Sequence, residues 1–513
     1  MKIAIIGAGP GGLASAINLA GLGHDVTVLE KEQLPGGRMR GITFGDYTAD
    51  TGPTMMQLPQ VLERIFTRAG KRLADYVTLR GLEPNTRLHF WDGSKLDTSR
   101  DTARMMEGLR ALSPELPKAF ERWLDDARRK YPLAYEKFIC NRADSLGYYA
   151  PWRLLDVLPF KPWQTLYTHL NSFFHDDRVT YAMSYPSKYL GLHPTTCSSV
   201  FSVIPYLEVE YGVWHVMGGF RALAQGMARC ATDLGATFRY GAAVSRVIVE
   251  HGRAKGVELQ GGERLDFDAV VINADLPWAA SHLLSSETRA GTQLSDAKLD
   301  RARFSCSTFM MYLGLDKRFD ELPHHLIYLS EAVRRTDRAA LEDLAADVDD
   351  PPFYVCNPTP TDPAGAPDGH STLYVLVPTP NTRRDVNWAD VKEKLAARVP
   401  GWLAKVGLHD VAAHIKEQRV FTAETWRDDF NVAHGAVFNL SHDWMQLGPL
   451  RPKVKSPDVD GLFWVGGGTH PGSGLLTIFE SANIVGDYFA RDAGLGGLPQ
   501  WPFTPREPLA EAR

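Results

Sequence analysis

Glycines near the start of the chain have the spacing of a site that binds the pyrophosphate of a dinucleotide. They lie in the run Gly7, Ala8, Gly9, Pro10, Gly11 and Gly12, between a β-branched apolar stretch over residues 3–6 and a helical pattern over residues 13–21. Glycine here permits a tight turn, a close approach of the backbone to the phosphates and close packing of the helix on the strand. Because the helix N-terminus would face the phosphates, the run predicts a dinucleotide site.

Two adjacent charged residues follow the next expected strand. That strand covers residues 25–29 and ends at Glu30, about twenty residues beyond the glycines. At this position a carboxylate can accept hydrogen bonds from the adenosine ribose. We assign Glu30, together with the adjacent Lys31, to the same cofactor site.

A second glycine-containing turn indicates which dinucleotide is bound. The turn consists of Gly36, Gly37 and Arg38. A plain nicotinamide-binding domain does not need such a turn, so it favours FAD over NAD. The alternative is an ordinary loop with a surface arginine. We assign a further cofactor segment to Gly52, Pro53 and Thr54.

The C-terminal part of the chain has its own glycine-rich crossing from a strand to a helix. A short strand over residues 461–465 leads into residues 466–474 and then into a helical pattern over residues 475–490. Exposed backbone N–H groups and a positive helix end suit the electron-rich end of a reduced flavin. We assign to the cofactor site Gly467, Gly468, Thr469, Gly474 and Leu475.

Few side chains are candidates for proton transfer or metal binding. His470 lies in the C-terminal glycine-rich segment, and an imidazole can move a proton near neutral pH, although it could equally pack against the cofactor. Arg221 and Asp144 are weaker candidates, because charged side chains are more often solvated or paired. His324 and His325 are expected at the edge of a loop and a strand. No motif with metal-ligand spacing is present, and we predict no metal.

The chain resembles the bacterial-type carotenoid desaturases, the phytoene desaturase family of FAD-dependent oxidoreductases, over nearly its whole length. The segments that carry the resemblance are residues 7–38, 204–228, 309–316, 354–378 and 463–482. The resemblance implies FAD as cofactor and a long apolar polyene as substrate. It also implies that adenine lies against the strand around Val247 and that Asn273 lies close to the cofactor.

We predict an α/β fold, that of a two-domain flavoprotein with a helical membrane-facing cap. A discontinuous, Rossmann-like FAD-binding domain would comprise residues 1–61, 219–290 and 432–513. Residues 62–218, mainly helical by periodicity, would form the cap and the membrane contact. Residues 291–431, with two strong strand patterns, would form a mixed-sheet substrate-binding domain.

One stretch of the cap has the composition of a membrane-interface segment. Residues 148–163 combine two Trp, two Tyr and aliphatic residues with isolated basic residues. Amphipathic rings and snorkelling cations suit the headgroup region, although the same residues could cover the core of the cap. The resemblance favours the membrane, because a long polyene has to be collected from a bilayer. We therefore expect a cytoplasmic protein that associates peripherally with membranes.

Composition excludes several classes of partner. A net charge of −5 spread along the 513 residues argues against binding to nucleic acid. The five cysteines are scattered and include no CxxC pair, which indicates reduced thiols and no thiolate metal site. The sequence shows neither a secretory leader nor a run of about 18 apolar residues.

The flavin is the reactive group that the motifs reveal. Desaturation beside a polyene needs loss of a hydride to the flavin and of a proton from the neighbouring carbon. The delocalised cation makes that C–H acidic, so a strong base is not required. Electrons would pass on to a membrane quinone or oxygen.

The C-terminal tail suggests which carotenoid is oxidised. Residues 472–481 depart from the phytoene desaturase pattern and look more like late-pathway relatives. We therefore expect a 3,4-desaturase of a hydroxylated or lycopene-type acyclic carotenoid. The alternatives are a phytoene or diapophytoene desaturase and an amine-oxidase-like flavoenzyme.

Overall fold

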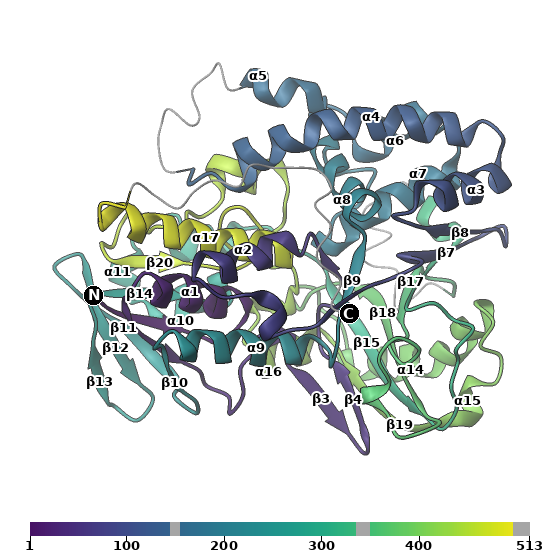
Figure 1. Ribbon diagram of the computed structural model, residues 1–513. Helices are drawn as coiled ribbons and strands as arrows, with labels where there is room; N and C mark the ends of the chain where they lie inside the picture. The colour runs from purple at the N-terminus through teal and green to yellow at the C-terminus, as the bar shows by residue number, and fades with distance from the viewer. Residues whose placement is uncertain (144–153, 335–348, 496–513) are drawn as a thin grey trace.

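The computed structural model describes residues 1–143, 154–334 and 349–495. Within these residues the molecule has two large sheets and a layer of helices (Figure 1). One sheet lies near the N-terminus on the left of the view, the other lies at the lower right, and the helical layer covers the top.

The sheet near the N-terminus is parallel, and its described part has five strands in the order β10-β2-β1-β14-β20. The strands are β1 (Lys2–Ile6), β2 (Asp25–Leu29), β10 (Thr237–Arg239), β14 (Ala269–Ile272) and β20 (Leu462–Trp464). Short runs of Ile and Val that are buried on both faces favour such strands, because helices cover a parallel sheet on both sides. The sheet thus unites parts of the chain more than 400 residues apart, such as Ile5 and Phe463, through Val271.

Three long helices lie beside this sheet, and α1 packs against both of the others (Figure 1). They are α1 (Pro10–Gly21), α9 (Phe220–Asp233) and α17 (Leu475–Asp492). A small antiparallel sheet contacts β14 and α10 and contains β11 (Val244–Glu250), β12 (Arg253–Leu259) and β13 (Arg264–Asp266). Short helices follow, namely α10 (Leu276–Leu283), α11 (Ser286–Arg289) and α12 (Asp296–Arg301).

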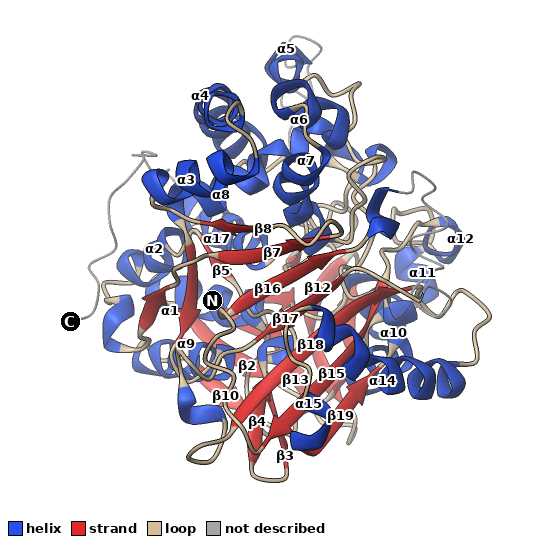
Figure 2. Cartoon of the chain, turned by 90° about the vertical axis from the view of Figure 1, so that its right-hand side faces the viewer, coloured by secondary structure: helices blue, strands red, loops and turns tan. Residues whose placement is uncertain are grey.

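The second large sheet is mixed, with seven described strands in the order β19-β15-β18-β17-β16-β7-β8. They are β7 (Thr86–Phe90), β8 (Lys95–Thr98), β15 (Ser307–Leu315), β16 (His325–Leu329), β17 (Phe353–Cys356), β18 (Ser371–Thr379) and β19 (Ile415–Phe421). One face packs against α14 (Trp388–Lys405) and α15 (Val411–His414), as Figure 2 shows. The other face carries Met310, Tyr312, Tyr354 and Tyr374, which belong to the central core.

The described part of residues 62–218 is mainly helical, as we expected, but it also contributes strands that we did not predict. The hairpin β7–β8 belongs to this segment but is part of the mixed sheet, in which β7 pairs parallel to β16. The local sequence explains this hairpin. Leu88 and Phe90 are each 2% exposed and alternate with more polar residues, and this alternation is typical of a strand. Another small sheet joins β5 (Met56–Gln57), β9 (Val213–Val216) and β6 (Leu79–Gly81).

The helical layer forms the remainder of that segment. It contains α3 (Thr102–Leu112), α4 (Leu116–Ala134), α5 (Leu154–Val157), α6 (Leu166–Phe174), α7 (Asp177–Ser184) and α8 (Val203–Tyr211). These helices lie above both sheets in Figures 1 and 2. The helix α2 (Gln60–Arg68), the hairpin of β3 (Gly41–Phe44) and β4 (Tyr47–Asp50), and α16 (Ala423–Phe430) connect the layers. Among the helices described, none has the length and apolarity needed to cross a membrane.

Candidate active site

A cavity of about 580 Å³ runs between the parallel sheet and the mixed sheet. This volume is within the range of small-molecule and cofactor sites. Segments from both sheets and from the loops between them form its wall. Of the residues that we assigned to the cofactor, the wall includes Gly7, Gly9, Pro10, Glu30, Lys31, Gly37, Arg38, Gly52, Pro53, Thr54, Asn273, Gly467, Gly474 and Leu475.

The N-terminal glycines form the turn between β1 and α1 at one end of the cavity. Gly7 has a φ of +94°, which favours glycine, and a Cβ atom on Gly12 would overlap the carbonyl oxygen of Gly7. The helix can therefore begin directly against the strand. Gly7, Gly9 and Pro10 face the cavity, whereas Ala8, Gly11 and Gly12 lie behind them.

Glu30 is buried at the same end and orders the surrounding backbone. Its carboxylate accepts hydrogen bonds from the N–H of Ala8, at 2.6 Å, and from the N–H of Glu32, at 3.0 Å. The carboxylate thus links the end of β2 to the glycine turn. Lys31 lies beside it, and its ammonium group donates to the carbonyl oxygen of Asp429 at 3.3 Å.

Asn273 follows β14 and contacts the glycine turn from the other side. Its Nδ2 donates to the carbonyl oxygen of Gly7 at 3.1 Å, and the side chain lines the cavity.

Val247, against whose strand we expected the adenine, does not line the described cavity. Val247 is 6% exposed and packs within the core around the small sheet, while Val244 faces the cavity together with Ala242 and Ala243. A register shift between Val244 and Arg246 changes which residues face the cavity, and a simple strand pattern does not reveal it.

The turn at residues 36–38 places a half-buried arginine on the wall of the cavity. Gly36 has a φ of +131°, and its N–H donates to the carbonyl oxygen of Ala8 at 2.8 Å. The guanidinium of Arg38 donates to the carbonyl oxygen of Val437 at 2.6 Å. Burial lowers the pKa of Arg38, and the charge of Asp275 opposes that effect. Arg38 is therefore not the surface arginine of an ordinary loop.

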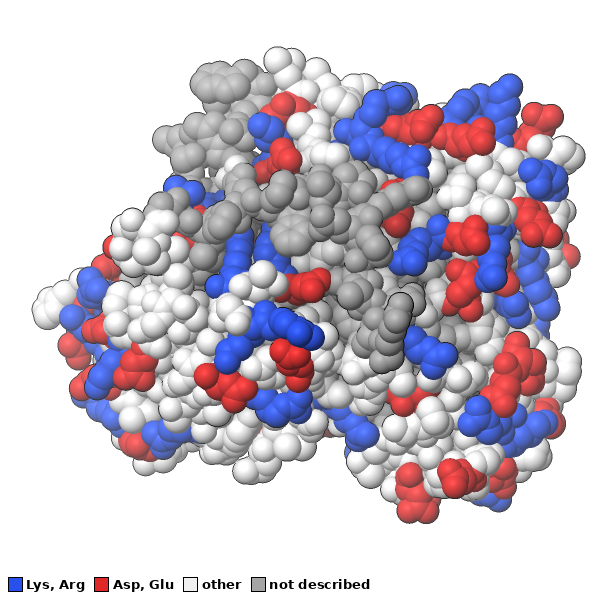
Figure 3. Space-filling model, in the orientation of Figure 1, with Lys and Arg blue, Asp and Glu red and all other residues white. Residues whose placement is uncertain are grey.

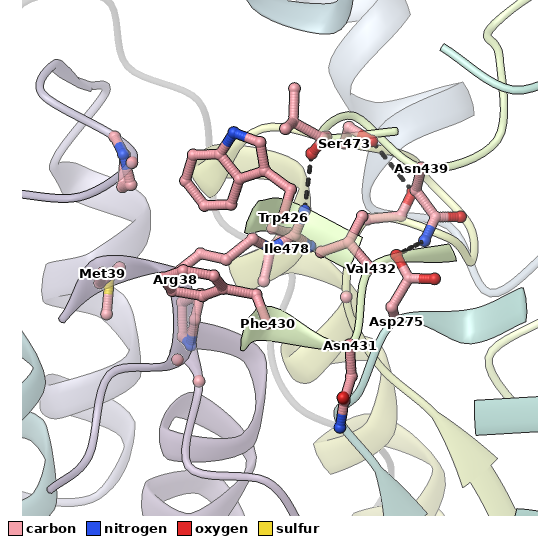
Figure 4. Close-up of a pocket in the computed structure, with 18 of the residues that line it drawn as sticks. Arg38, Met39, Asp275, Trp426, Phe430, Asn431, Val432, Asn439, Ser473 and Ile478 are labelled. Atoms are coloured by element: carbon pink, nitrogen blue, oxygen red, sulfur yellow. Dashed lines mark hydrogen bonds between the residues drawn. The ribbon is translucent and has the colours of Figure 1, made fainter. Parts of the chain in front are cut away.

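Asp275 carries the complementary charge on the cavity wall. Burial raises its pKa, whereas Arg38 and donated hydrogen bonds lower it. One of these bonds comes from the Nδ2 of Asn439, at 2.5 Å, and is drawn in Figure 4. Figure 4 also shows Trp426 and Phe430 close to Arg38 on the same wall.

Buried tyrosines of the mixed sheet hold the loop at residues 51–54. Tyr312 donates to the carbonyl oxygen of Thr51 at 2.5 Å, and Tyr374 donates to that of Gly52 at 3.4 Å. The hydroxyl groups of Tyr354 and Thr54 are 2.7 Å apart. The loop therefore lies where the parallel sheet and the mixed sheet meet along the cavity.

The C-terminal crossing places the start of α17 at the cavity. Gly474 precedes the helix with a φ of +101°, and Leu475 is its first residue. Gly468 and Thr469 lie behind the wall: Gly468 packs against Leu276, and Thr469 donates to the carbonyl oxygen of Pro452 at 2.8 Å.

His470 does not lie on the cavity wall as far as the chain is described. Its Nε2 donates to the carbonyl oxygen of Asn141 at 2.9 Å, and burial lowers its pKa to about 4. A neutral, hydrogen-bonded imidazole away from the cavity does not fit the proton-transfer role that we expected. Arg221 donates to the carbonyl oxygen of Gly218 at 3.3 Å and is also absent from the described wall, and Asp144 lies outside the described residues.

The sequence did not reveal the aromatic part of the wall. It contains Tyr185, Tyr189, Met310, Tyr354, Tyr374, Leu376, Trp426 and Phe430. Tyr374 and Leu376 alternate along β18, so the period of the strand could have identified its inward face. A wall of this composition suits an apolar, conjugated ligand.

A buried carboxyl group also lies behind this wall and was not predicted. Gln57 lines the cavity, and its Nε2 donates to Glu208 at 2.8 Å. Burial raises the pKa of Glu208 to about 7. Glu208 lies in the segment over residues 204–228 that carries the family resemblance, but its position behind the cavity wall becomes evident only in the folded chain.

The sequence profile of the flavin-containing amine oxidoreductases matches residues 10–482. The chain belongs to that family. Members of the family use FAD, and this flavoenzyme is a FAD-dependent oxidoreductase. Among the relatives of this chain are carotenoid desaturases, one of them 65% identical over 98% of the chain, and the enzyme belongs with them as an oxidoreductase that acts on CH–CH donors. A mutant putrescine oxidase of known structure has the same fold, with a TM-score of 0.63, 16% identity and coverage of 96% of this chain and 98% of that chain.

Two relatives from Myxococcus xanthus are carotenoid desaturases. An all-trans-zeta-carotene desaturase is 65% identical over 98% of this chain and 96% of its own length. A zeta-carotene-forming phytoene desaturase is 36% identical, with the same coverage. The expectation of a late-pathway 3,4-desaturase is wrong, because a relative this similar is a zeta-carotene desaturase.

We based that expectation on the C-terminal tail, part of which is buried in the protein and does not line the cavity. Four residues of the tail reach the cavity, namely Ser473, Gly474, Leu475 and Ile478, but Phe479, Glu480 and Ser481 are buried in the protein. Glu480 forms an ion pair with Arg64 of α2 and accepts a hydrogen bond from Tyr135. Residues in this tail therefore reflect how α17 is anchored more than which substrate is bound.

The cavity fits FAD. The glycine turn at α1 gives the backbone room to approach phosphates, Glu30 lies at the end of β2, and the wall continues without a break to the N-terminus of α17. Arg38 and Asn273 line the same wall.

Proposed function

We propose that the enzyme desaturates an acyclic carotene at the level of zeta-carotene, at a carbon–carbon single bond next to the polyene. The observation that carries this proposal is the 65% identity, over 98% of the chain, to an all-trans-zeta-carotene desaturase. The aromatic part of the cavity wall supports it, because its Tyr, Trp and Met side chains offer apolar contact to a long chain.

FAD, when bound, accepts the two electrons of the oxidation. The protein contributes position and exclusion of water. Tyr354 and Tyr374 hold the loop at residues 51–54 and at the same time face the cavity. They therefore fix the aromatic part of the wall, which would contact the substrate, relative to the cofactor segment at residues 52–54. Loss of hydride next to a polyene leaves a delocalised cation, whose adjacent C–H is acidic enough for a weak base or water to remove the proton.

We assign the cofactor contacts to residues from both ends of the cavity. Gly7 and Gly9 would lie at the pyrophosphate, and Glu30 at the ribose. The N-terminus of α17, with Gly474 and Leu475, would lie at the flavin ring, where a positive helix end favours developing negative charge. Their positions along one continuous wall support this order.

Peripheral membrane association completes the proposal. Leu155, Leu158 and Trp163 lie in or next to α5 and are 64%, 47% and 69% exposed. Residues 148–153 of the expected membrane segment lie outside the described residues. Figure 3 shows largely uncharged surface at the top of the molecule, over α5, and mixed charges elsewhere on that face. Large exposed apolar side chains at one end of the molecule suit insertion into a headgroup region.

Anaerobic reduction of the FAD-loaded enzyme tests the reaction. The enzyme is mixed with liposomes that contain zeta-carotene, phytoene or lycopene, or with putrescine, and bleaching of the visible flavin band is followed. Zeta-carotene should bleach it fastest and give a product with a longer polyene. Faster bleaching by phytoene would favour a phytoene desaturase, and bleaching by putrescine alone would reject the carotenoid reaction.

A further inference from the structure

Two histidines and a cysteine meet behind the wall of the cavity, on the mixed sheet. His324, His325 and Cys356 are 5%, 0% and 3% exposed, and one nitrogen or sulfur atom from each lies within 4.8 Å of the others. His325 and Cys356 are direct partners in the antiparallel pairing of β16 with β17. The two strands thus hold a nitrogen and a sulfur donor face to face.

Each histidine is oriented by a hydrogen bond to one of its ring nitrogens. The Nδ1 of His324 is 3.0 Å from the hydroxyl of Thr361, and the Nδ1 of His325 is 2.7 Å from the hydroxyl of Tyr354. The Nε2 atoms of both rings are buried and have no hydrogen-bond partner within the described chain. Metal-bound histidines have this arrangement, with one nitrogen on the ion and the other held by a neighbouring group.

The space beside the cluster is small and carries further donors. A cavity of about 20 Å³ is lined by His324 and Cys356 and also by Asp50 and His215. The ring of His215 lies 4.6 Å from that of His324, measured between centroids. A thiolate and the Asp50 carboxylate would together balance a charge of +2.

We propose that His324, His325 and Cys356 bind a borderline-soft divalent cation of the zinc type. Imidazole and thiolate are the ligands that such ions prefer in proteins. The fourth position would face the small cavity and would be filled by a water or by the second oxygen of Asp50, because the first accepts from the N–H of Phe220 at 2.8 Å. The Nε2 of His215 is already 3.0 Å from Asp362. The spacing in the sequence hides this site, because Cys356 lies on the next strand and approaches the histidines only through sheet pairing.

The site would act as a structural clamp on the active-site wall. Tyr354 connects the hydroxyl of Thr54 to the Nδ1 of His325, and both Tyr354 and Thr54 line the main cavity. A cation on His325 and Cys356 would fix β16 against β17 and therefore fix Tyr354. This inference does not depend on which carotene is the substrate.

Elemental analysis of the full-length enzyme, purified without a metal-affinity tag, tests the proposal. The enzyme is dialysed against buffer with Zn²⁺, then freed of loose metal, and close to one zinc per chain is expected. Replacement by Co²⁺ should give thiolate charge-transfer bands and long-wavelength d–d bands beyond the flavin absorption. Wild-type protein that retains no zinc and gives no cobalt spectrum would overturn the proposal and leave a buried, metal-free histidine pair.

Variants separate the site from general stability. His324→Asn and His325→Asn keep a side-chain amide near the Nδ1 position and remove the Nε2 donor, and Cys356→Ser removes the sulfur. Each should lose zinc and the cobalt bands, whereas Cys230→Ser, a buried cysteine in α9, should keep both. A chelator should lower the melting temperature of the wild type but not of His325→Asn. Zinc retained by all three ligand variants would also overturn the proposal.

Discussion

Arg38 donates a hydrogen bond of 2.6 Å to the carbonyl oxygen of Val437, 399 positions further along the chain. The contact joins the turn after β2 to the segment that precedes the C-terminal strand, across the middle of the cavity. Both residues line that cavity, so the guanidinium connects the N-terminal and the C-terminal segments of its wall.

Arg38→Met should therefore weaken FAD binding. The change leaves the buried carbonyl of Val437 and the carboxylate of Asp275 without a charged partner, and we expect a loss of about 2–3 kcal/mol in FAD affinity. Titration of the apoprotein with FAD, followed by flavin fluorescence, measures it. Arg221→Met is the matched control and should bind FAD like the wild type, because Arg221 lies off the described wall. Equal affinities for Arg38→Met and the wild type would contradict the assignment.

Glu30→Ala should also weaken FAD binding, by about 1.5–3 kcal/mol if a charge-assisted hydrogen bond to the ribose is lost. The same carboxylate accepts N–H groups from Ala8 and Glu32, so the change also loosens the glycine turn. Glu30→Gln keeps one acceptor oxygen and should show a smaller loss. Equal FAD content in Glu30→Ala and the wild type would remove Glu30 from the site.

The cofactor end of the cavity could be predicted from the sequence because its motifs are local. Gly7, Glu30 and Arg38 lie within a single strand–helix–strand unit, so spacing alone indicates that they share a site. The aromatic wall could not be predicted in this way, since Tyr185, Tyr354 and Trp426 come from segments that only tertiary packing brings together.

His470 shows why a local motif can fail. Its glycine-rich surroundings do approach the cavity, at Gly467 and Gly474, but the backbone between them turns the imidazole towards Asn141. Spacing along the chain indicates which residues are near a site, and side-chain direction depends on the packing of distant segments. The His324, His325 and Cys356 cluster was missed for the same reason.

The buried imidazole of His470 should make stability depend on pH. Its pKa is about 4 in the folded protein, below the ordinary value of 6.5. Between these values the unfolded chain binds more protons, so the free energy of unfolding falls as the pH drops from 6.5 to 4. His470→Gln can keep the hydrogen bond to Asn141 and should remove about 2–3 kcal/mol of that fall. Urea unfolding at several pH values measures the difference.

Catalysis by His470→Gln gives an independent result. Removal of a catalytic acid or base costs about 100-fold or more in rate, whereas a packing residue costs much less. We expect the variant to retain turnover to within about tenfold, with an unchanged pH profile between pH 6 and 8. A loss of more than about 100-fold at normal FAD content would restore a catalytic role.

The apolar side chains near α5 should control membrane binding. Leu155 and Trp163 are 64% and 69% exposed, and burial of such side chains in a bilayer contributes about 1.5–3 kcal/mol each. The double variant Leu155→Glu and Trp163→Glu should therefore float with liposomes at least about tenfold less than the wild type. High salt should weaken wild-type flotation only in part, and detergent should release the protein, because apolar contacts dominate.

A substitution far from α5 provides the control for that experiment. Tyr240 is 37% exposed and follows β10, which lies at the opposite end of the molecule from α5 in Figure 1. Tyr240→Glu adds one negative charge at an exposed aromatic position and should float like the wild type, whereas the single variant Trp163→Glu adds the same charge and should float less. If Trp163→Glu and Tyr240→Glu both float as well as the wild type, the exposed residues near α5 make no contact with lipid. If both lose binding equally, net charge, rather than apolar insertion at α5, governs association with the membrane.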